Sequence, residues 1–317
     1  MIEIVSVFSG VGGLDLGFSK AGFNIIYSND INKDVKESYN TNFKTKIDIK
    51  SVYDMNFNNY HGVSGIIGGP PCQDFSVNGS MRGVEGKNGK LVWEYLRVVG
   101  EIKPKFFIFE NVPGLLTETH YDSFLKLIKE FLRIGYRTNY RVLNANDYNV
   151  PQERYRVIII GTRIDRKPFM FPLKHSYKPV LMDAISDIYK EFPDYDIHYS
   201  TRYMSGNRTR NWNEPSFVIM GSLGWLPQHP NFPMVPNGEN WKFIYPNHRR
   251  LTVEECKRIQ TFPDDFKFIG SDEKKIRMIG NAVPPNLAYS LAISIKNQMK
   301  NIYYGWEMDT SYYEVDE

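Results

Sequence analysis

The first half of the chain alternates short apolar runs with amphipathic stretches, and this alternation constrains the fold more than any other feature. Four runs rich in β-branched and aromatic residues, each bounded by Gly, Asn or Pro, are typical of strands: IEIVSVF, NIIYSN, VSGIIGG and KFFIFEN. Between them, apolar residues recur at helical spacing over residues 14–21, 33–42, 91–102 and 121–134. Strands that alternate with helices predict an α/β fold with a parallel, doubly wound sheet.

Two further runs, YRTNYRVLNA and YRVIIIGTR, follow with no room for a crossover helix between them. We therefore expect an antiparallel hairpin at the sheet edge. From about Lys167 to His248 the chain is rich in Pro, Asn and aromatic residues without a clear period, which predicts an irregular second domain. Helical patterns return at Thr252, where TVEE has capping-box spacing, and in PPNLAYSLAISIKNQMK.

Composition indicates an ordinary globular protein. Of 317 residues, 42% are hydrophobic and 24% charged, and the net charge of +3 is too small to indicate nucleic-acid binding by itself. The two cysteines, Cys72 and Cys256, match no paired metal-ligand spacing, so we expect no metal site and a reduced, cytoplasmic setting. The start MIEIVSVFSG lacks a basic region, and no run approaches the ~20 apolar residues of a membrane span, so we expect no membrane association.

Ligands of doubly wound sheets bind at the carboxyl ends of the strands, and FSGVGGLDLGF lies at the first of these ends. Its glycines at positions 10, 12 and 13 would let a ligand approach the backbone ahead of a helix. The dinucleotide fingerprint would require glycine in place of Asp15, which counts against a nicotinamide oxidoreductase.

Two carboxylates follow the next strand-like segments. Asp30 is placed to hydrogen-bond ribose hydroxyls, and Asp48 is placed to accept from an adenine amine. Each of them, considered alone, fits a solvated turn or a helix cap equally well.

GIIGGPPCQDFS places Cys72 after the third predicted strand, behind Pro70 and Pro71. An isolated cysteine is more often buried and inert than reactive, but this position on the ligand face favours a nucleophile. FFIFENVPG likewise places Glu110 at the end of the fourth strand, where apolar neighbours raise the proton affinity of a carboxylate and suit an acid. A helix-capping glutamate is the alternative interpretation.

VPQERYRV places Arg154 and Arg156 on one side of a strand, because alternate residues share a face. A solvated strand face is the simpler interpretation of these two residues alone. A thiol, an acid and paired guanidinium groups beside a nucleoside-type pocket, however, form a definite catalytic constellation.

With these residues in view, the chain resembles the cytosine carbon-5 DNA methyltransferases of bacterial restriction-modification systems. Six of the family's motifs occur in the family's order from residue 8 to beyond residue 290: FSGVGGLDLGF, GGPPCQDFS, ENVPG, VPQERYRV, RRLTVEECKRIQTFPDDF and GNAVPPNLA. The resemblance implies a catalytic and cofactor-binding domain at residues 1–172 plus 279–317, with a target-recognition domain at 173–278 inserted before the C-terminal helix.

The resemblance also implies S-adenosylmethionine as the cofactor. The cofactor-binding residues that it implies are Phe8, Gly10, Gly12, Gly13, Asp30, Ile31, Asp48, Pro70 and Asn281. By the same resemblance, Cys72 would attack carbon-6 of a cytosine flipped out of duplex DNA. Glu110 would bond the ring nitrogen and the exocyclic amine, while Arg156, together with Arg154, would hold the ring oxygen and the thiol region.

DNA recognition is expected in two parts of the chain. The loop SVNGSMRGVEGKNGK after Cys72 is predicted to be a lid that closes on DNA, with Asn78 and Arg82 as contacts; an ordinary surface loop is the alternative. Residues 201–250 carry three tryptophans (Trp212, Trp225 and Trp241) and six basic residues suited to DNA contact, namely Arg202, Arg208, Arg210, Lys242, Arg249 and Arg250. At least one of these tryptophans is expected to form a small core instead.

Arg208 and Arg210 are the two basic residues for which we most expect DNA contact. The stretches NRTRNWNEPSF and QHPNFP resemble the recognition region of GGCC-specific members, whereas VIMGSLGWLP departs from it and Gly224 stands where those members carry an arginine. GGCC is therefore a hypothesis for the target site.

Two other functions remain open. A transfer-RNA cytosine methyltransferase shares the catalytic motifs but carries a CFT tripeptide that is absent here. A non-catalytic DNA-binding module would not require all four of Cys72, Glu110, Arg154 and Arg156. The resemblance further implies a monomer that acts on double-stranded DNA, with a cognate restriction endonuclease for the same site as a possible partner.

Overall fold

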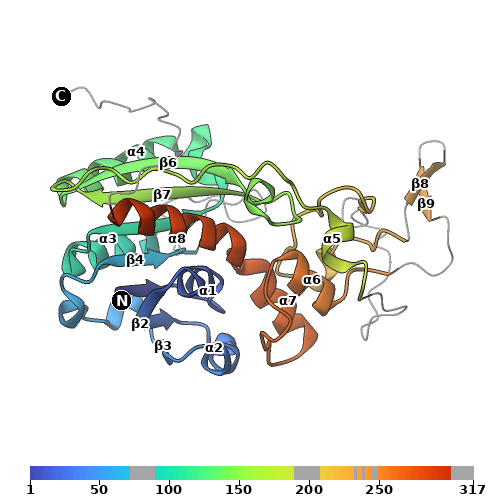
Figure 1. Cartoon of the computed structure of the whole chain (residues 1–317), viewed down its shortest axis with the longest axis horizontal. Coiled ribbons are helices and arrows are strands. Elements are labelled where there is room, and N and C mark those ends of the chain that lie inside the picture. Colours follow the sequence, from blue (N-terminus) through green and yellow to red (C-terminus); the bar gives the residue numbers. More distant parts are fainter. Residues whose placement is uncertain (72–89, 189–207, 232–233, 238–239, 244–248, 301–317) are drawn as a thin grey trace.

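The computed structural model describes residues 1–71, 90–188, 208–231, 234–237, 240–243 and 249–300. Its main element is a seven-stranded sheet in the order β3-β2-β1-β4-β5-β7-β6 (Figure 1). The strands are β1 (Ile2–Val7), β2 (Phe23–Asp30), β3 (Ile47–Ile49), β4 (Gly65–Gly68), β5 (Phe106–Asn111), β6 (Tyr136–Asn144) and β7 (Tyr155–Arg163). The first five pair in parallel, which confirms the doubly wound α/β fold.

Strands β6 and β7 form the expected antiparallel hairpin at the edge of the sheet. β7 is the inner strand of the pair and lies antiparallel to β5, with Glu110 opposite Ile158 and Asn111 opposite Val157. The helices that follow β1 to β5 are α1 (Gly13–Lys20), α2 (Lys36–Asn42), α3 (Lys90–Ile102) and α4 (Glu118–Arg133). Strand β3 has only three residues, and the sequence pattern did not identify it as a strand.

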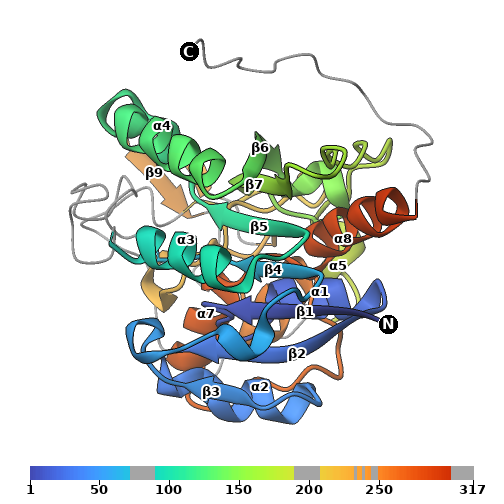
Figure 2. The same cartoon turned by 90° about the vertical axis from the view of Figure 1, so that its left-hand side faces the viewer.

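The sheet is buried on both faces because successive residues of each strand point to opposite sides. In β5, Phe106 and Ile108 enter one core cluster, whereas Phe107 and Phe109 enter another. The first cluster includes residues of α1 and of α8 (Pro285–Met299), and the second includes residues of α3 and α4. Figure 2 shows the sheet between these two pairs of helices.

Helix α8 returns from the C-terminal part of the chain to pack against the first helix, α1 (Figure 1). The contact is close at Gly17, where an added Cβ would lie 2.4 Å from the Cβ atom of Ala288 and 2.6 Å from the carbonyl oxygen of Pro285. The end of α8 also holds the segment after β7, because Ser294 donates a hydrogen bond to the carbonyl oxygen of Met170. The predicted apolar stripe of this helix therefore packs in the core of the N-terminal sheet.

A second group of elements lies beyond the sheet (Figure 1). It comprises α5 (Leu181–Ile185), the β8–β9 pair (Met234–Asn237 and Asn240–Phe243), α6 (Val253–Ile259) and α7 (Asp272–Asn281). Its apolar cluster joins α5, α6 and α7 with Ile219 and Leu226, and Trp212 packs against that cluster. One tryptophan of the irregular region therefore has the core role expected of it. The predicted capping box is confirmed, with reciprocal hydrogen bonds between Thr252 and Glu255.

Across the described ranges, the model contains no helix that is both long enough and apolar enough to cross a membrane.

We expect Gly17→Ala to destabilise the fold by about 1–3 kcal/mol, because the new methyl group overlaps α8 and forces the two helices apart. Urea denaturation measures the change. Gly100→Ala in α3 is the matched control, since its Cβ would meet only Ile134 Cδ1 at 3.9 Å and alanine favours the helix. Equal loss of stability in both variants would contradict the proposed packing.

Candidate active site at the carboxyl ends of the strands

The turn between β1 and α1 depends on left-handed backbone conformations. Phe8, Gly10 and Gly12 have φ angles of 54°, 55° and 89°. A Cβ atom at Gly12 would lie 2.5 Å from the Phe43 ring, and one at Gly13 would lie 2.1 Å from the Val283 carbonyl oxygen. These two glycines are therefore required by packing within the protein itself. Gly10 has no atom within 4 Å of its Cβ position, so it alone keeps open space for a ligand.

Asp30 fixes this turn to the end of β2. One carboxylate oxygen accepts the Gly10 backbone N–H at 2.8 Å, and the other accepts the Asn32 backbone N–H at 2.8 Å. Burial raises the pKa of Asp30, although these backbone hydrogen bonds act against that change. The glycine turn and the end of β2 therefore form one hydrogen-bonded unit.

Ile31 and Asp48 lie along the same edge. Ile31, directly after β2, is 68% exposed. Asp48 lies in β3 opposite Asn29, accepts a hydrogen bond from the Tyr27 hydroxyl at 3.2 Å and pairs with Lys50 at 3.3 Å. Predicted cofactor residues from two neighbouring strands thus lie side by side.

Glu110 and Arg156 meet where β5 ends and β7 begins. Arg156 Nε lies 2.8 Å from Glu110 Oε1, and each side chain is only 13% exposed. A Cβ atom at Gly69 would lie 2.6 Å from Glu110 Oε2, so the backbone after β4 directly adjoins this carboxylate. Asn111 donates a hydrogen bond from Nδ2 to the Pro70 carbonyl oxygen at 3.3 Å. An acid, a guanidinium group and the Pro-Pro turn are therefore brought together.

Four residues expected to act in the site or on DNA lie outside the described residues: Cys72, Asn78, Arg82 and Arg202. The side chain of Lys242 is likewise not described. Pro71, the residue before Cys72, is the last described residue of that segment.

Arg154 does not lie beside Arg156 on a strand face as expected. Strand β7 begins one residue after it, and the Arg154 side chain is 1% exposed. Its guanidinium donates hydrogen bonds to three backbone carbonyl oxygens: those of Ile219 (3.2 Å), Gly280 (2.8 Å) and Ala282 (3.0 Å). Two of these oxygens lie at the C-terminus of α7, where a cation is favoured by the helix dipole.

Gln152 and Gln260 extend this buried network and were not singled out in the sequence. Gln152 Nε2 donates to Gln260 Oε1 at 2.6 Å, and its Oε1 accepts the Ile219 backbone N–H at 3.1 Å. Gln260 in turn donates to the carbonyl oxygens of Ile279 and Ala282. Gln152 stands within the VPQERYRV motif, but nothing in the sequence indicates its partner more than 100 residues away.

Asn281 is the last residue of α7 and is exposed. Its Oδ1 would be 2.8 Å from a Cβ atom at Gly221, so it adjoins the segment after Ile219. The two following residues pack on the glycine turn, because Gly13 lies against Ala282 and Val283. Asn281 therefore stands between that segment and the predicted cofactor loop.

Asp15 is a further polar residue that the sequence marked only as a departure from the dinucleotide fingerprint. It is fully buried and accepts hydrogen bonds from the hydroxyl groups of Ser6 (2.6 Å) and Tyr39 (2.5 Å). Burial raises the pKa of Asp15 to about 6, even though these two hydrogen bonds act to lower it. An acidic residue between leucines in GGLDLGF was the available signal of a buried role.

The basic residues expected to contact DNA differ in exposure. Arg208 is exposed, and Arg210 is 23% exposed. Arg249 and Arg250 are 2% and 1% exposed, which contradicts a phosphate-binding role for them. Arg249 forms two 2.8 Å hydrogen bonds with Glu255, and Arg250 donates to a backbone carbonyl of the same cluster.

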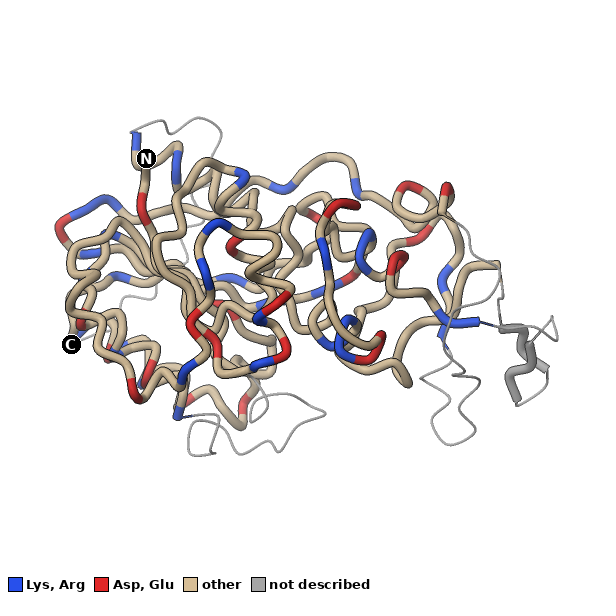
Figure 3. The backbone as a smooth tube through the Cα atoms, turned by 90° about the horizontal axis from the view of Figure 1, so that it is seen from below, with Lys and Arg blue, Asp and Glu red and all other residues tan. Residues whose placement is uncertain are grey.

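Basic and acidic residues are interspersed along the described backbone rather than separated onto two faces (Figure 3). Across the same residues, no group of three or more His, Cys, Asp or Glu side chains is placed to hold a metal ion.

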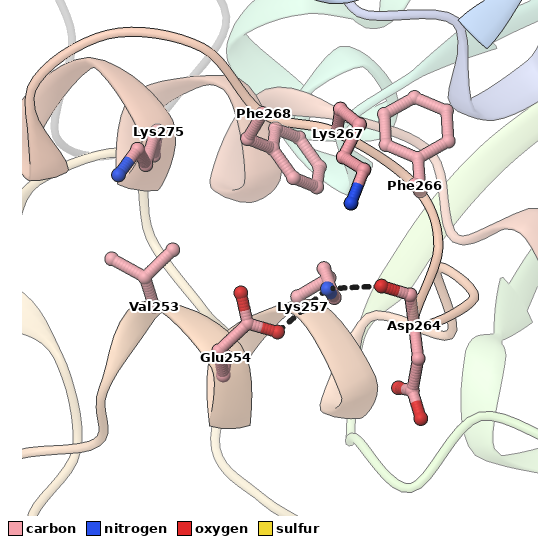
Figure 4. A pocket seen from close by; sticks show the side chains of 8 residues that line it. All are labelled: Val253, Glu254, Lys257, Asp264, Phe266, Lys267, Phe268 and Lys275. Atoms are coloured by element: carbon pink, nitrogen blue, oxygen red, sulfur yellow. Dashed lines mark hydrogen bonds and ion pairs between the residues drawn. The ribbon is translucent and has the colours of Figure 1, made fainter.

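A surface pocket of about 190 Å³ lies in the C-terminal part of the chain (Figure 4). Its lining comes from α6, α7 and the segment between them: Val253, Glu254, Lys257, Asp264, Phe266, Lys267, Phe268 and Lys275. Lys257 pairs with Glu254 at 2.6 Å and donates to the Asp264 carbonyl oxygen at 2.9 Å. The pocket contains none of the predicted site residues, so we do not assign the chemistry to it.

A family model and curated proteins that resemble this chain agree on its class. The family model for C-5 cytosine-specific DNA methylases matches residues 2–217 and 189–297. The chain is 42% identical to the Type II methyltransferase M.MthTI of Methanothermobacter thermautotrophicus, over 95% of this chain and 99% of that protein. It is 39% identical to the Type II methyltransferase M.FnuDI of Fusobacterium nucleatum, over 94% and 95% of the two chains.

Solved structures share the fold at much lower identity. The Entamoeba histolytica methyltransferase EhMeth superimposes with a TM-score of 0.75 at 17% identity, over 94% of this chain and 99% of that one. The S. pombe Dnmt2 methyltransferase gives a TM-score of 0.72 at 17% identity, over 95% of this chain and all of that one.

The raised pKa of Asp15 predicts a specific pH dependence of stability. Between its ordinary value of 3.8 and about 6, the folded state binds more protons than the unfolded state. The contribution of Asp15 to stability is therefore present in acid and is lost as pH rises through about 6. Relative to Asp15→Asn, the wild-type free energy of unfolding should fall by about 2.5 kcal/mol between pH 4 and 7.

Urea unfolding at several pH values measures this difference. Asp147 provides a control of opposite sign: burial acts to raise its pKa, but hydrogen bonds from Lys178 and Lys174 lower the pKa overall. The wild type should therefore gain stability relative to Asp147→Asn as pH rises through the acid range. A wild-type advantage over Asp15→Asn that is constant or grows with pH would refute the assignment.

Proposed function

Because this chain belongs to the C-5 cytosine-specific DNA methylase family, we propose that the carboxyl ends of β1, β4 and β5 hold the active site of a DNA (cytosine-5-)-methyltransferase. The family assigns the enzyme class, and the curated relatives bear the name Type II methyltransferase, which belongs to restriction-modification systems. The observation that carries the site assignment is the convergence of Glu110, Arg156 and the turn before Cys72.

We propose S-adenosylmethionine as the cofactor, which supplies an electrophilic methyl group when bound. The residues present fit its adenosine part. Exposed Ile31 offers an apolar surface for the adenine ring, and Asp48 lies on the neighbouring strand. Each Asp30 oxygen accepts one backbone hydrogen bond and retains a lone pair for a ribose hydroxyl. Gly10 leaves room beside the turn.

The target cytosine would be held by Glu110 and Arg156 after it leaves the DNA stack. The 2.8 Å ion pair fixes the side chain so that Glu110 Oε2 faces the turn at Gly69. There it can accept a hydrogen bond from the exocyclic amine and, once it carries a proton, donate one to the ring nitrogen. The Cys72 thiolate would form a bond to carbon-6, which makes carbon-5 nucleophilic. After methylation, carbon-5 loses its proton, and departure of the thiolate restores the ring double bond.

We propose that residues 1–172 with 279–317 form the catalytic domain and that residues 173–278 form the target-recognition domain. The packing of α8 on α1 supports the first assignment, and the apolar cluster that joins α5 and α6 with Ile219 and Leu226 supports the second. We further propose a monomeric, cytoplasmic enzyme that acts on double-stranded DNA and shares its site with a cognate restriction endonuclease.

The function is tested by transfer of labelled methyl from S-adenosylmethionine to unmethylated DNA and to transfer RNA. We expect label at cytosine carbon-5 in DNA and loss of at least 99% of it in Cys72→Ser, because serine is a far weaker nucleophile. Cys256→Ala is the matched control, since Cys256 is fully buried and burial raises its pKa, so it takes no part in the chemistry.

Other outcomes of this assay point to other functions. Label only in transfer RNA would move the chain to the RNA-modifying class, and DNA binding without any transfer would favour a non-catalytic module. Sequencing of the modified cytosines identifies the target site. Methylation of a site other than GGCC would exclude the GGCC hypothesis.

The contact between Gly69 and Glu110 gives a second test of the site. A methyl group at residue 69 would displace Glu110 Oε2, so we expect Gly69→Ala to lower kcat about tenfold or more while the fold remains intact. Gly100→Ala in α3 is the matched control, because its Cβ would have only Ile134 Cδ1 at 3.9 Å. Unchanged kcat in Gly69→Ala would argue against a catalytic role for this carboxylate.

A further inference from the structure

Arg208 and Arg210 share one aromatic ring. Their guanidinium carbons lie 4.5 Å and 4.2 Å from the centre of the Phe217 ring, both within the range of a cation–π interaction. The sequence alone gave the two arginines the same expected function, direct contact with DNA. Their remaining contacts differ, however, and this difference separates their functions.

Arg210 is held by carboxylates. Its Nη2 lies 2.6 Å from Glu153 Oε2, and its Nη1 lies 3.1 Å from Glu214 Oε1. The backbone N–H of Asn211 lowers the pKa of Glu214, and the hydrogen bond from Arg210 adds to this effect, so the carboxylate stays charged near neutral pH. The positive charge of Arg210 is thus compensated within the protein.

Arg208 has no such partner. Within the part of the chain that the structure describes, no carboxylate forms an ion pair with its guanidinium, which is exposed on the Phe217 ring. The ring restricts the side chain without neutralising it. An exposed, uncompensated and restrained guanidinium is suited to contact a phosphate or a guanine edge at a low entropic cost.

The Phe217 segment is attached to residues 151–153, which lead into β7, the strand that supplies Arg156. Ser216 donates a backbone hydrogen bond to the Pro151 carbonyl oxygen, and the Glu153 N–H donates to the Ser216 carbonyl oxygen, both at 2.9 Å. The Glu153–Arg210 ion pair lies beside this short ladder and connects the same two segments. Any displacement of residues 208–217 would therefore change their distance from the Glu110–Arg156 pair.

We propose that Arg208 contacts DNA, whereas Arg210 is a positioning residue. Through Glu153, Arg210 fixes residues 208–217 to the segment that leads into β7. This inference rests on the proposed function and revises the expectation that both arginines bind DNA. Arg210 acts on catalysis only through the placement of Arg208 and Phe217 relative to the target-base site.

The test compares Arg208→Ala, Arg210→Ala, Glu153→Gln and the Arg210→Ala/Glu153→Gln double variant. The probe is a short unmethylated duplex that carries the site mapped by sequencing, or random-sequence duplex if no site is found. Two quantities are measured: the DNA dissociation constant as a function of salt, and the methylation rate at saturating DNA. Arg133→Ala and Glu130→Gln are matched charge controls, because these residues form a remote ion pair on α4.

Arg208→Ala should weaken DNA binding about tenfold, lower the slope of log affinity against log salt by about one if the contact is to a phosphate, and leave the saturated rate within about twofold of wild type. Arg210→Ala should leave the salt slope unchanged and lower the saturated rate about tenfold. Glu153→Gln should reproduce the Arg210→Ala defect, and the double variant should be no worse than either single variant.

The direction in which Glu153→Gln changes DNA binding shows whether Arg210 positions the segment or itself binds DNA. If Arg210 itself binds DNA, its release from Glu153 would tighten binding beyond the Glu130→Gln control, and Arg210→Ala would weaken binding and lower the salt slope. Either result overturns the proposal. The binding measurements do not depend on methyl transfer, so a wild-type protein that binds DNA without methylating it would refute the proposed function and still distinguish the two arginines. Absence of DNA binding would refute both.

Discussion

The buried guanidinium of Arg154 holds together three stretches of chain that are far apart in the sequence. Arg154 directly precedes β7, and its guanidinium donates hydrogen bonds to the carbonyl oxygens of Ile219, Gly280 and Ala282. Hydrogen bonds to a charged donor stabilise by about 1.5–3 kcal/mol each, and a buried cation without them would be strongly unfavourable. These hydrogen bonds therefore constrain the relative placement of the Ile219 segment, the end of α7 and the start of β7.

Close packing at a glycine, rather than a charged group, connects the end of α7 to the predicted cofactor loop. Arg154 binds the Ala282 carbonyl oxygen, and the next residue, Val283, lies against Gly13, where any side chain would collide with it. Gly12 is packed as tightly against the Phe43 ring. Gly13 thus serves the closure of the C-terminal segment onto the N-terminal sheet, whereas Gly12 serves packing against α2. Among the glycines at positions 10, 12 and 13, Gly10 alone combines a left-handed conformation with open space.

The sequence predicted what depends on local pattern and missed what depends on distant partners. FFIFEN predicts β5 because four apolar residues are followed by Glu110 and Asn111 at the end of the strand. TVEE predicts the start of α6 because both residues of the capping box, Thr252 and Glu255, lie within the motif. Arg154 was misplaced because alternation within VPQERYRV says nothing about carbonyl groups 65 or more residues away. Arg249 was assigned to DNA contact for a different reason, because its partner Glu255 is only 6 residues away but the pairing needs α6 in place.

The order of the hairpin strands determines whether the acid and the guanidinium meet. β7 lies between β5 and β6, so Arg156 enters from the opposite direction and reaches the end of β5 beside Glu110. If β6 were the inner strand, Arg156 would lie one strand spacing farther away, about 4.8 Å, beyond ion-pair distance. The choice follows from composition: VIIIG in β7 is buried on both faces, as an inner strand requires, whereas RTNYRV in β6 is polar and half-exposed. The hydrophobic effect that places four apolar residues inside the sheet therefore also places the guanidinium against the carboxylate.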